Sequence, residues 1–270
     1  MRGQLYLVDA GDGAVAQLAK AGLRLPAVQG VFLSHLHFDH TGGMLAVIGL
    51  RMQLEVQGTL RVFGPPGTRE LVDGLLAASR PAMRAGYGIP GQGWSADIEV
   101  VELTDGDAVS LDGFEVTVAE NSHFSMPEGD SRAAPSVSLS YRFDLADRSI
   151  VYTGDTGPSD ALAELAQGAD LLISEMIDVD AVLALMRPPG AAAPGSSDPG
   201  EATGFAWHMH AHHLTPIQVG ELAGAAGVGR LVVTHFAPNP MDQEQAQRYL
   251  DAIGENFDGD AELAVDLGRY

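Results

Sequence analysis

The stretch SHLHFDHTGG, residues 34–43, decides how this sequence is interpreted. It follows an apolar run that predicts a strand over 28–35, and within six positions it holds three histidines and one aspartate: His35, His37, Asp39 and His40. Four such polar groups at a strand end carry a large desolvation cost unless something binds them together. Divalent metals do so, because neutral imidazole and carboxylate are among their natural ligands. We therefore expect a metal site, with the first two histidines on one ion and the Asp-His pair turned to a second.

Composition excludes several classes of protein. The chain has 270 residues, 46% of them apolar, which is enough for one large domain with a sizeable core. Its 36 acidic and 15 basic side chains give a net charge of −21. A surface this acidic repels polyphosphate, so we expect no nucleic-acid partner. No apolar run is long enough to span a membrane. The absence of cysteine excludes a disulfide framework, a thiolate zinc site and a cysteine nucleophile.

Short apolar runs alternate with helical patterns along the chain. The runs predict strands at 4–10, 28–35, 60–66, 169–175 and 231–235, with several more between 98 and 155. Helices are predicted up to Lys20, over 68–78 and 159–167, and from Thr215 to Gly227. Strands precede helices in both halves, which favours a layered α/β fold. The Pro/Gly/Ala/Ser-rich segment 188–204 predicts a flexible insertion, with a mobile lid as the alternative.

Four motifs resemble those of one known family. HLHFDH at 35–40 matches the HxHxDH signature of the metallo-β-lactamase superfamily, and His123 in ENSHF, Asp155 in VYTGDTG and His235 in VVTHF follow in that family's order. The resemblance covers about residues 4–240. It implies an αββα sandwich of the metallo-β-lactamase type, one domain over 1–270 and two divalent metal ions, with zinc expected and iron or manganese open.

The same resemblance implies a role for each motif residue. One ion would be bound by His35, His37 and His123, and the second by Asp39, His40 and His235. Asp155 would bridge the two ions. Asp39 would also orient the attacking hydroxide, which two metals generate by lowering the pKa of the water between them.

LLISEM and the segment that starts at HHLTPIQ resemble the branch that holds the tRNA 3′-processing endonucleases (RNase Z) and the arylsulfatase-like hydrolases. In that branch a Glu after a strand pairs with a His ahead of a Thr-containing helix cap, which implies Glu175 and His213 here. A buried carboxylate orients the imidazole and raises its pKa, which suits a general acid. For the remaining histidines of HMHAHH we expect a polar cleft or solvent, with an extra metal site as the alternative: His208, His210 and His212.

These features predict a binuclear metal-dependent hydrolase of small esters, with a carboxylic ester or lactone favoured and an aryl sulfate next. RNase Z enzymes resemble one another in a long, basic, glycine-rich arm that clamps tRNA. Here only 31 residues separate His123 from Asp155, and no such arm is present elsewhere. Two alternatives to the ester hydrolase therefore stay open. One is a phosphodiesterase or tRNA 3′-processing endonuclease, and the other is a non-catalytic metal-binding protein.

The N-terminal region carries no signal-peptide pattern, which favours the cytoplasm as the sequence is written and leaves a secreted or periplasmic location open. Family members usually place glycine-rich strands before the position of residues 4–9. Either the sheet lacks N-terminal strands, or the sequence starts late. An unpaired edge favours pairing between chains, and related enzymes are commonly homodimers, so we expect a homodimer.

Overall fold

A computed structural model describes residues 4–126, 135–186, 204–240 and 242–270. The chain divides into two compact units. The first comprises residues 1–104 with Arg269, and the second comprises residues 105–268 with Tyr270. Each unit has its own sheet and its own hydrophobic core. The single domain over 1–270 stays a prediction.

The first unit is built on a four-stranded sheet in which all neighbours are parallel, in the order β1-β2-β3-β4. Its strands are β1 (Leu5–Val8), β2 (Val28–Phe32), β3 (Leu60–Gly64) and β4 (Ile98–Glu102). Its helices are α1 (Ala14–Lys20), the 3-10 turn η1 (Leu25–Ala27), α2 (Phe38–Thr41), α3 (Met44–Gln53) and α4 (Thr68–Ala85). Because parallel strands point the same way, the residues that follow β1 and β2 meet at one edge of this sheet.

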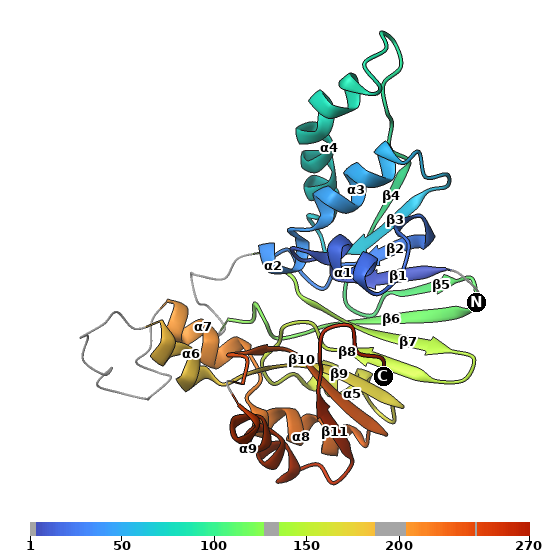
Figure 1. The fold of residues 1–270 in the computed structure, drawn as a ribbon. Coiled ribbons are helices and arrows are strands. Elements are labelled where there is room, and N and C mark those ends of the chain that lie inside the picture. The colour runs from blue at the N-terminus through green and yellow to red at the C-terminus, as the bar shows by residue number, and fades with distance from the viewer. Residues whose placement is uncertain (1–3, 127–134, 187–203, 241) are drawn as a thin grey trace. The chain divides into compact units, whose positions relative to one another are not determined.

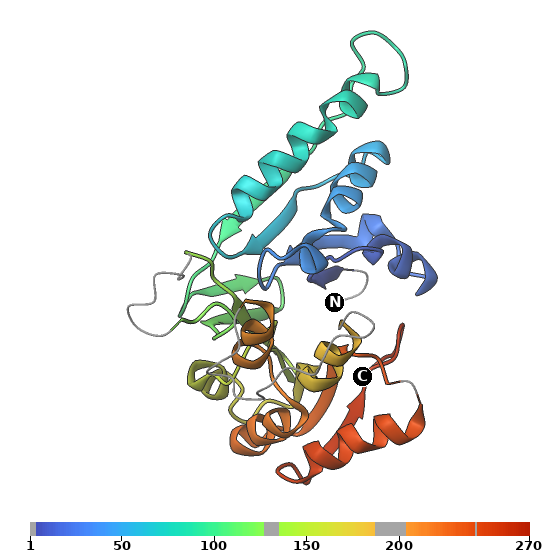
Figure 2. The ribbon, with the colours of Figure 1, turned by 90° about the vertical axis from the view of Figure 1, so that its left-hand side faces the viewer.

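The core of the first unit lies between this sheet and the apolar faces of its helices. Val31 and Val62 from the strands pack with Met44 and Ile48 of α3, and all four are essentially inaccessible to solvent. Helix α4 extends well past the ends of the strands before the chain returns to β4 (Figure 2).

The second unit contains a seven-stranded mixed sheet in the order β11-β10-β9-β8-β7-β6-β5. Its strands are β5 (Ala108–Leu111), β6 (Phe114–Glu120), β7 (Leu139–Leu145), β8 (Ser149–Tyr152), β9 (Leu171–Ile177), β10 (Arg230–Ala237) and β11 (Asp260–Leu263). Its helices are α5 (Asp160–Leu165), α6 (Val179–Leu185), α7 (Phe205–His212), α8 (Pro216–Ala226) and α9 (Gln243–Gly254). The strands β8 to β11 are parallel, whereas β7 is antiparallel to both β6 and β8. Strand β6 therefore runs in the same direction as β8, β9 and β10.

Helices α5, α8 and α9 cover one face of this second sheet (Figure 1). Their buried side chains, such as Leu162, Val219 and Ile253, pack on Leu172 and Leu231 of the strands. Helix α8 begins at a complete capping box, in which the Thr215 hydroxyl accepts from the Gln218 amide. It ends at Gly227, whose left-handed φ of 60° suits glycine.

The α/β class is confirmed, and every predicted strand and helix has a counterpart, although α4 continues to Ala85 where the prediction ends at 78. The predicted flexible insertion at 188–204 lies outside the described residues except for Gly204, which precedes α7. Within the described part of the chain, no helix combines the length and the apolar character needed to cross a bilayer.

Candidate metal centre

Two predicted ligands of the first unit lie side by side after β2. His35 is fully buried, whereas His37, the residue that precedes α2, is exposed. His35 Nε2 and His37 Nδ1 share a hydrogen bond of 2.9 Å, and the ring centroids are 4.6 Å apart. These two side chains therefore lie close enough to bind the same ion.

His40 is held by a carboxylate that the sequence analysis did not identify. Its Nδ1 lies 2.8 Å from Asp9 Oδ2, and its Nε2 lies 3.7 Å from the exposed carboxylate of Asp39. The Asp9 carboxylate also accepts from the Ser34 amide at 2.7 Å and from the Ser34 hydroxyl at 2.8 Å. Carboxylates that accept from the far ring nitrogen of a histidine fix its tautomer for metal binding. Asp9 could have been found from its place after β1, because β1 and β2 end at the same edge.

The backbone of the histidine stretch packs directly on the segment that follows β1. Ala10 N donates to the carbonyl of His40, and Gly43 N donates to the carbonyl of Ala10, both at 2.8 Å. A Cβ atom on Gly43 would overlap the carbonyl oxygen of Gly11. This close approach holds the predicted ligands against the end of β1.

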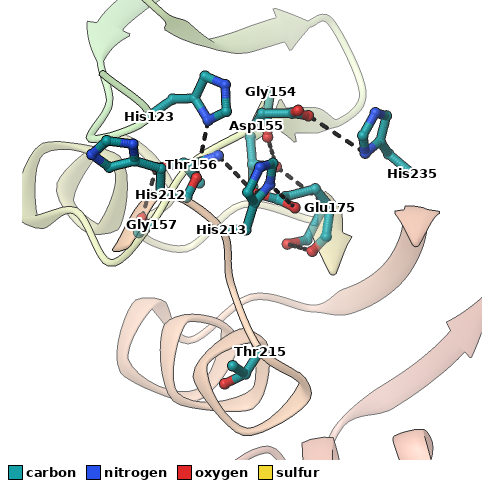
Figure 3. Close-up of polar contacts among 12 residues, drawn as sticks. His123, Gly154, Asp155, Thr156, Gly157, Glu175, His212, His213, Thr215 and His235 are labelled. Carbon is teal, nitrogen blue, oxygen red and sulfur yellow. Dashed lines mark hydrogen bonds and ion pairs between the residues drawn. The ribbon is translucent and has the colours of Figure 1, made fainter. Parts of the chain in front are cut away.

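In the second unit, predicted site residues follow or end the four strands that run in one direction. His123 follows β6, Asp155 follows β8, Glu175 lies near the end of β9, and His235 lies near the end of β10. Since these strands point the same way, their side chains converge at one sheet edge, where Figure 3 shows them. Parallel strand direction thus explains why residues more than 100 positions apart come together.

His123 is completely buried and tightly positioned. Its backbone N–H donates to Asn121 Oδ1 at 3.1 Å, and its Nδ1 is 3.0 Å from the carbonyl oxygen of His212. Burial lowers the pKa of His123 to about 3, despite the opposing charge of Asp155. The imidazole is therefore neutral near pH 7, with a lone pair on Nε2 because Nδ1 donates to a carbonyl.

Asp155 and His235 lie next to each other. Asp155 Oδ1 is 3.5 Å from His235 Nδ1, and the carboxylate is almost fully buried. His235 has a left-handed φ of 46°, and the β9–β10 pairing shifts register between Val233 and Phe236. Such a bulge turns a side chain away from the regular alternation of a strand, which brings His235 to the edge.

Glu175 and His213 form the predicted pair. His213 Nδ1 lies 3.1 and 3.0 Å from the two carboxylate oxygens of Glu175, and both residues are buried. Glu175 Oε1 also accepts from the Thr156 amide at 2.8 Å. Burial raises the pKa of the Glu175 carboxyl. Burial also disfavours the charged form of His213, but the bond to Glu175 and the charges of Glu175 and Asp155 outweigh it and raise the pKa of His213.

His212 has a positioning role that the sequence analysis missed. Its carbonyl accepts from His123, and its Nε2 lies 2.6 Å from the carbonyl oxygen of Ser125. Burial lowers the pKa of His212, which favours the neutral ring. Its signal in the sequence was only its place in the HMHAHH run.

The chemistry of these donors fits a divalent metal. Clusters of histidine and carboxylate in the described residues could hold one, and one such group lies wholly within the second unit. Neutral imidazoles whose far nitrogens are hydrogen-bonded, together with buried carboxylates, are the donors that zinc and similar ions take. No cysteine is present to replace any of them.

Comparison with known proteins gives a consistent result. The model of the beta-lactamase superfamily domain matches residues 5–236. A ribonuclease Z of Mycobacterium marinum (strain ATCC BAA-535 / M) is 33% identical over 277 residues, covering 99% of this chain and 88% of the relative. Among solved structures, the metallo-beta-lactamase fold protein YhfI of Bacillus subtilis superposes with a TM-score of 0.67 at 19% identity, over 98% of this chain and 85% of that one. The short form of human tRNase Z superposes with a TM-score of 0.64 at 20% identity, over 99% and 88%.

These relatives correct two predictions. The small-ester substrate and the absence of a nucleic-acid partner are wrong, because relatives that align over nearly the whole chain are ribonucleases. The net charge of the whole chain does not describe the field at one site, because salt screens distant charges. The esterase and arylsulfatase subtypes have no support, whereas the metallo-β-lactamase fold and a hydrolase activity do. The protein belongs to the metallo-β-lactamase superfamily, in the branch that holds ribonuclease Z.

Proposed function

We propose that this protein is a metal-dependent endoribonuclease of the ribonuclease Z kind, which hydrolyses a phosphodiester bond at the 3′ side of precursor tRNA. The observation that carries the proposal is the buried Glu175–His213 pair, at the same sheet edge as His123, Asp155 and His235. A proton donor at an edge lined with metal-ligand side chains is what cleavage of an unactivated phosphodiester requires. The relatives named ribonuclease Z support the choice of substrate.

The assignment of ligands follows the family's motif order. His35, His37 and His123 would hold one divalent ion, and Asp39, His40 and His235 the other, with Asp155 shared. Zinc is the expected metal because most of these donors are imidazoles. When bound, the two ions supply an activated water and neutralise charge on the phosphate.

The chain's own residues do the remaining work. Asp9 and the His212 carbonyl hold His40 and His123 in the tautomers that present Nε2. The water attacks phosphorus, the bond from phosphorus to the ribose oxygen breaks, and His213 Nε2 gives its proton to that oxygen. Glu175 keeps His213 protonated beforehand, because its carboxylate accepts from Nδ1 and raises the pKa of the ring.

The test compares two substrates that differ in leaving group. His213→Ala should slow cleavage of a precursor tRNA by about 100-fold or more, the range for loss of a general acid. Hydrolysis of bis-p-nitrophenyl phosphate should fall far less, because p-nitrophenolate leaves without a proton. His210→Ala, in helix α7 three residues before His213, is the matched control, and metal content is measured for each variant.

Two outcomes count against the proposal. If His213→Ala cleaves the precursor tRNA at the wild-type rate, His213 is not the acid. If the metal-loaded wild type cleaves bis-p-nitrophenyl phosphate but no tRNA precursor, the substrate assignment is wrong. Cytoplasmic location and a homodimer both stay predictions.

A further inference from the structure

Three histidines of the second unit form a compact triangle that the proposed ligand assignment does not use as a set. His123, His208 and His213 have ring centroids 5.0, 5.0 and 5.3 Å apart, with interplanar angles of 67°, 76° and 86°. One nitrogen from each lies within 4.8 Å of the other two. The three ring planes are steeply inclined to one another and the ring centroids are nearly equidistant. Three imidazoles that bind one ion can adopt this arrangement.

A chain of hydrogen bonds fixes which nitrogen each ring presents. His212 Nε2 lies 2.6 Å from the Ser125 carbonyl oxygen and donates to it, so His212 Nδ1 in the neutral ring is an acceptor. His208 Nδ1, 2.8 Å away, must then be the donor in that pair. His208 therefore carries its lone pair on Nε2.

In the other two rings, too, the hydrogen-bonded nitrogen is Nδ1. Nδ1 of His123 donates to the His212 carbonyl, and Nδ1 of His213 donates to Glu175. In all three histidines a carbonyl, a carboxylate or a neutral imidazole holds Nδ1, so Nε2 is the nitrogen that would bind a metal; at His213 the metal would take the place of the proton on Nε2. This is the arrangement by which proteins orient histidine ligands of metals.

We propose that His123, His208 and His213 form a zinc site that belongs to the second unit alone. A tetrahedral zinc with bonds of about 2.0–2.1 Å to nitrogen sets the nitrogens about 3.4 Å apart. One ring nitrogen of each histidine already lies within 4.8 Å of the other two, so side-chain rotation can bring the three Nε2 atoms to that spacing. Two of the rings are buried and His208 is half-buried; a zinc ion held by three histidines takes water or an anion as its fourth ligand.

This site excludes the catalytic arrangement. One lone pair binds one ion, so zinc held here removes His123 from the set that includes His35 and His37. It also occupies the nitrogen from which His213 gives its proton. Excess zinc should therefore inhibit the enzyme. That consequence rests on the proposed function, whereas the site itself does not.

The first experiment counts zinc without reference to activity. His35→Ala/His37→Ala removes the first-unit histidines assigned to the same ion as His123. Equilibrium dialysis against micromolar zinc then compares this double variant carrying either His208→Gln or His210→Gln. We expect the His208→Gln protein to hold one zinc fewer per chain than the His210→Gln protein, with equal circular dichroism. Equal zinc counts would overturn the proposal.

A second measurement does not depend on the variants folding. Crystals of the wild-type chain grown with excess zinc should show an anomalous peak bonded to Nε2 of His208 and His213. A fully occupied catalytic pair with no zinc at His208 would also overturn the proposal.

The inhibition assay keeps the two proposals separate. With precursor tRNA as substrate, His208→Gln should raise the inhibitory zinc concentration about tenfold, whereas His210→Gln should leave it unchanged. If no variant cleaves RNA, the proposed function fails and the zinc count still decides the site. If cleavage is zinc-dependent but both variants are inhibited at the wild-type concentration, the inhibitory role fails and the proposed function stands.

Discussion

Replacement of Asp9 by Asn tests whether a remote carboxylate sets the metal-binding tautomer of His40. Asp9 accepts three hydrogen bonds, from the Ser34 amide, the Ser34 hydroxyl and His40 Nδ1. Asparagine has almost the same shape but only one oxygen. If that oxygen keeps the Ser34 amide, the new NH₂ group faces His40 Nδ1. The ring must then accept at Nδ1 and carry its proton on Nε2, which is the nitrogen nearer Asp39.

The expected loss of metal affinity follows from this exchange of donor and acceptor at His40 Nδ1. Loss of the outer hydrogen bond to a ligating histidine typically lowers metal affinity by about 10–100-fold, which is about 1.4–2.7 kcal/mol. The opposite orientation of the substituted side chain is also unfavourable, because its NH₂ group would then face the backbone N–H of Ser34. A buried amide left without its acceptor costs about 1–3 kcal/mol. Asp9→Asn should therefore weaken metal binding at His40, whichever way the new side-chain amide is oriented.

The assay is competition for zinc with a chromophoric chelator, together with NMR of the histidine ring nitrogens in the metal-free protein. We expect the weaker of the two zinc affinities to fall by at least tenfold, and the His40 ring to change tautomer. Asp12→Asn is the matched control, because it removes the same charge from an exposed position nearby. If Asp9→Asn binds zinc within twofold of the wild type, the orientation argument is refuted, whatever happens to the activity.

Three further results are expected. Thr215→Ala removes the hydroxyl that caps α8 and should lower the free energy of unfolding by about 1 kcal/mol in urea titrations; an unchanged midpoint would show that the cap contributes nothing. Hydrogen bonds from the Ser149 amide and hydroxyl lower the pKa of the exposed Asp170 from 3.8, so this carboxylate contributes stability above that pH which is lost as the pH falls through the folded pKa. Ser149→Ala should therefore flatten the acid side of the stability profile, and a profile parallel to that of the wild type would contradict the assignment. Treatment with EDTA should abolish phosphodiesterase activity and added zinc or manganese should restore it, whereas activity that persists in metal-free protein would contradict a metal-dependent mechanism.

The sequence predicted the elements whose patterns are local. The helix that begins at Thr215 and ends near Gly227 was predicted from capping residues alone, and α8 begins and ends there. Helix α4 is a case in which tertiary contacts outweigh the local sequence pattern. The predicted helix ends at residue 78, yet α4 continues through Pro81 to Ala85, although proline disfavours a helix interior. The Met83 carbonyl accepts from the Trp94 amide, and both side chains pack on the core of the first unit, so tertiary contacts outweigh the proline.

Helices without a strong apolar stripe were missed for a related reason. Helix α3, MLAVIGLRMQ, is apolar on most sides because much of it is buried, and therefore shows little helical periodicity. Helix α7, FAWHMHAH, was read only as a histidine run, although it is the helix that supplies His208 and the carbonyl that fixes His123. The periodicity of polar and apolar residues cannot reveal such helices, because tertiary contacts determine which of their residues are buried.

The candidate site divides in the same way. The motif residues could be named from the sequence because they match a family's motifs in the family's order. The place of Asp9 after β1 could have marked it as a candidate, but its role and that of His208 depend on contacts with other parts of the chain: Asp9 acts on His40, 31 positions away. Which hydrogen bond fixes which tautomer is a property of three-dimensional contacts, and no spacing rule encodes it.

The net charge gave a wrong prediction about a nucleic-acid partner because it is a property of the whole chain and not of the site. A net charge of −21 describes the whole chain, but salt screens exposed charges beyond about 8–10 Å at physiological ionic strength. What RNA meets at the site is the local field. Under the proposed function, two divalent ions would offset the charge of the buried Asp155 carboxylate, and His213, 3.0 Å from Glu175, would offset that of Glu175. A phosphate can therefore be attracted at one edge of a protein whose distant surface repels it. With only 15 basic residues in the chain, we expect under the proposed function that phosphate contacts add little affinity and that specificity comes from the shape of the substrate at the cleaved bond.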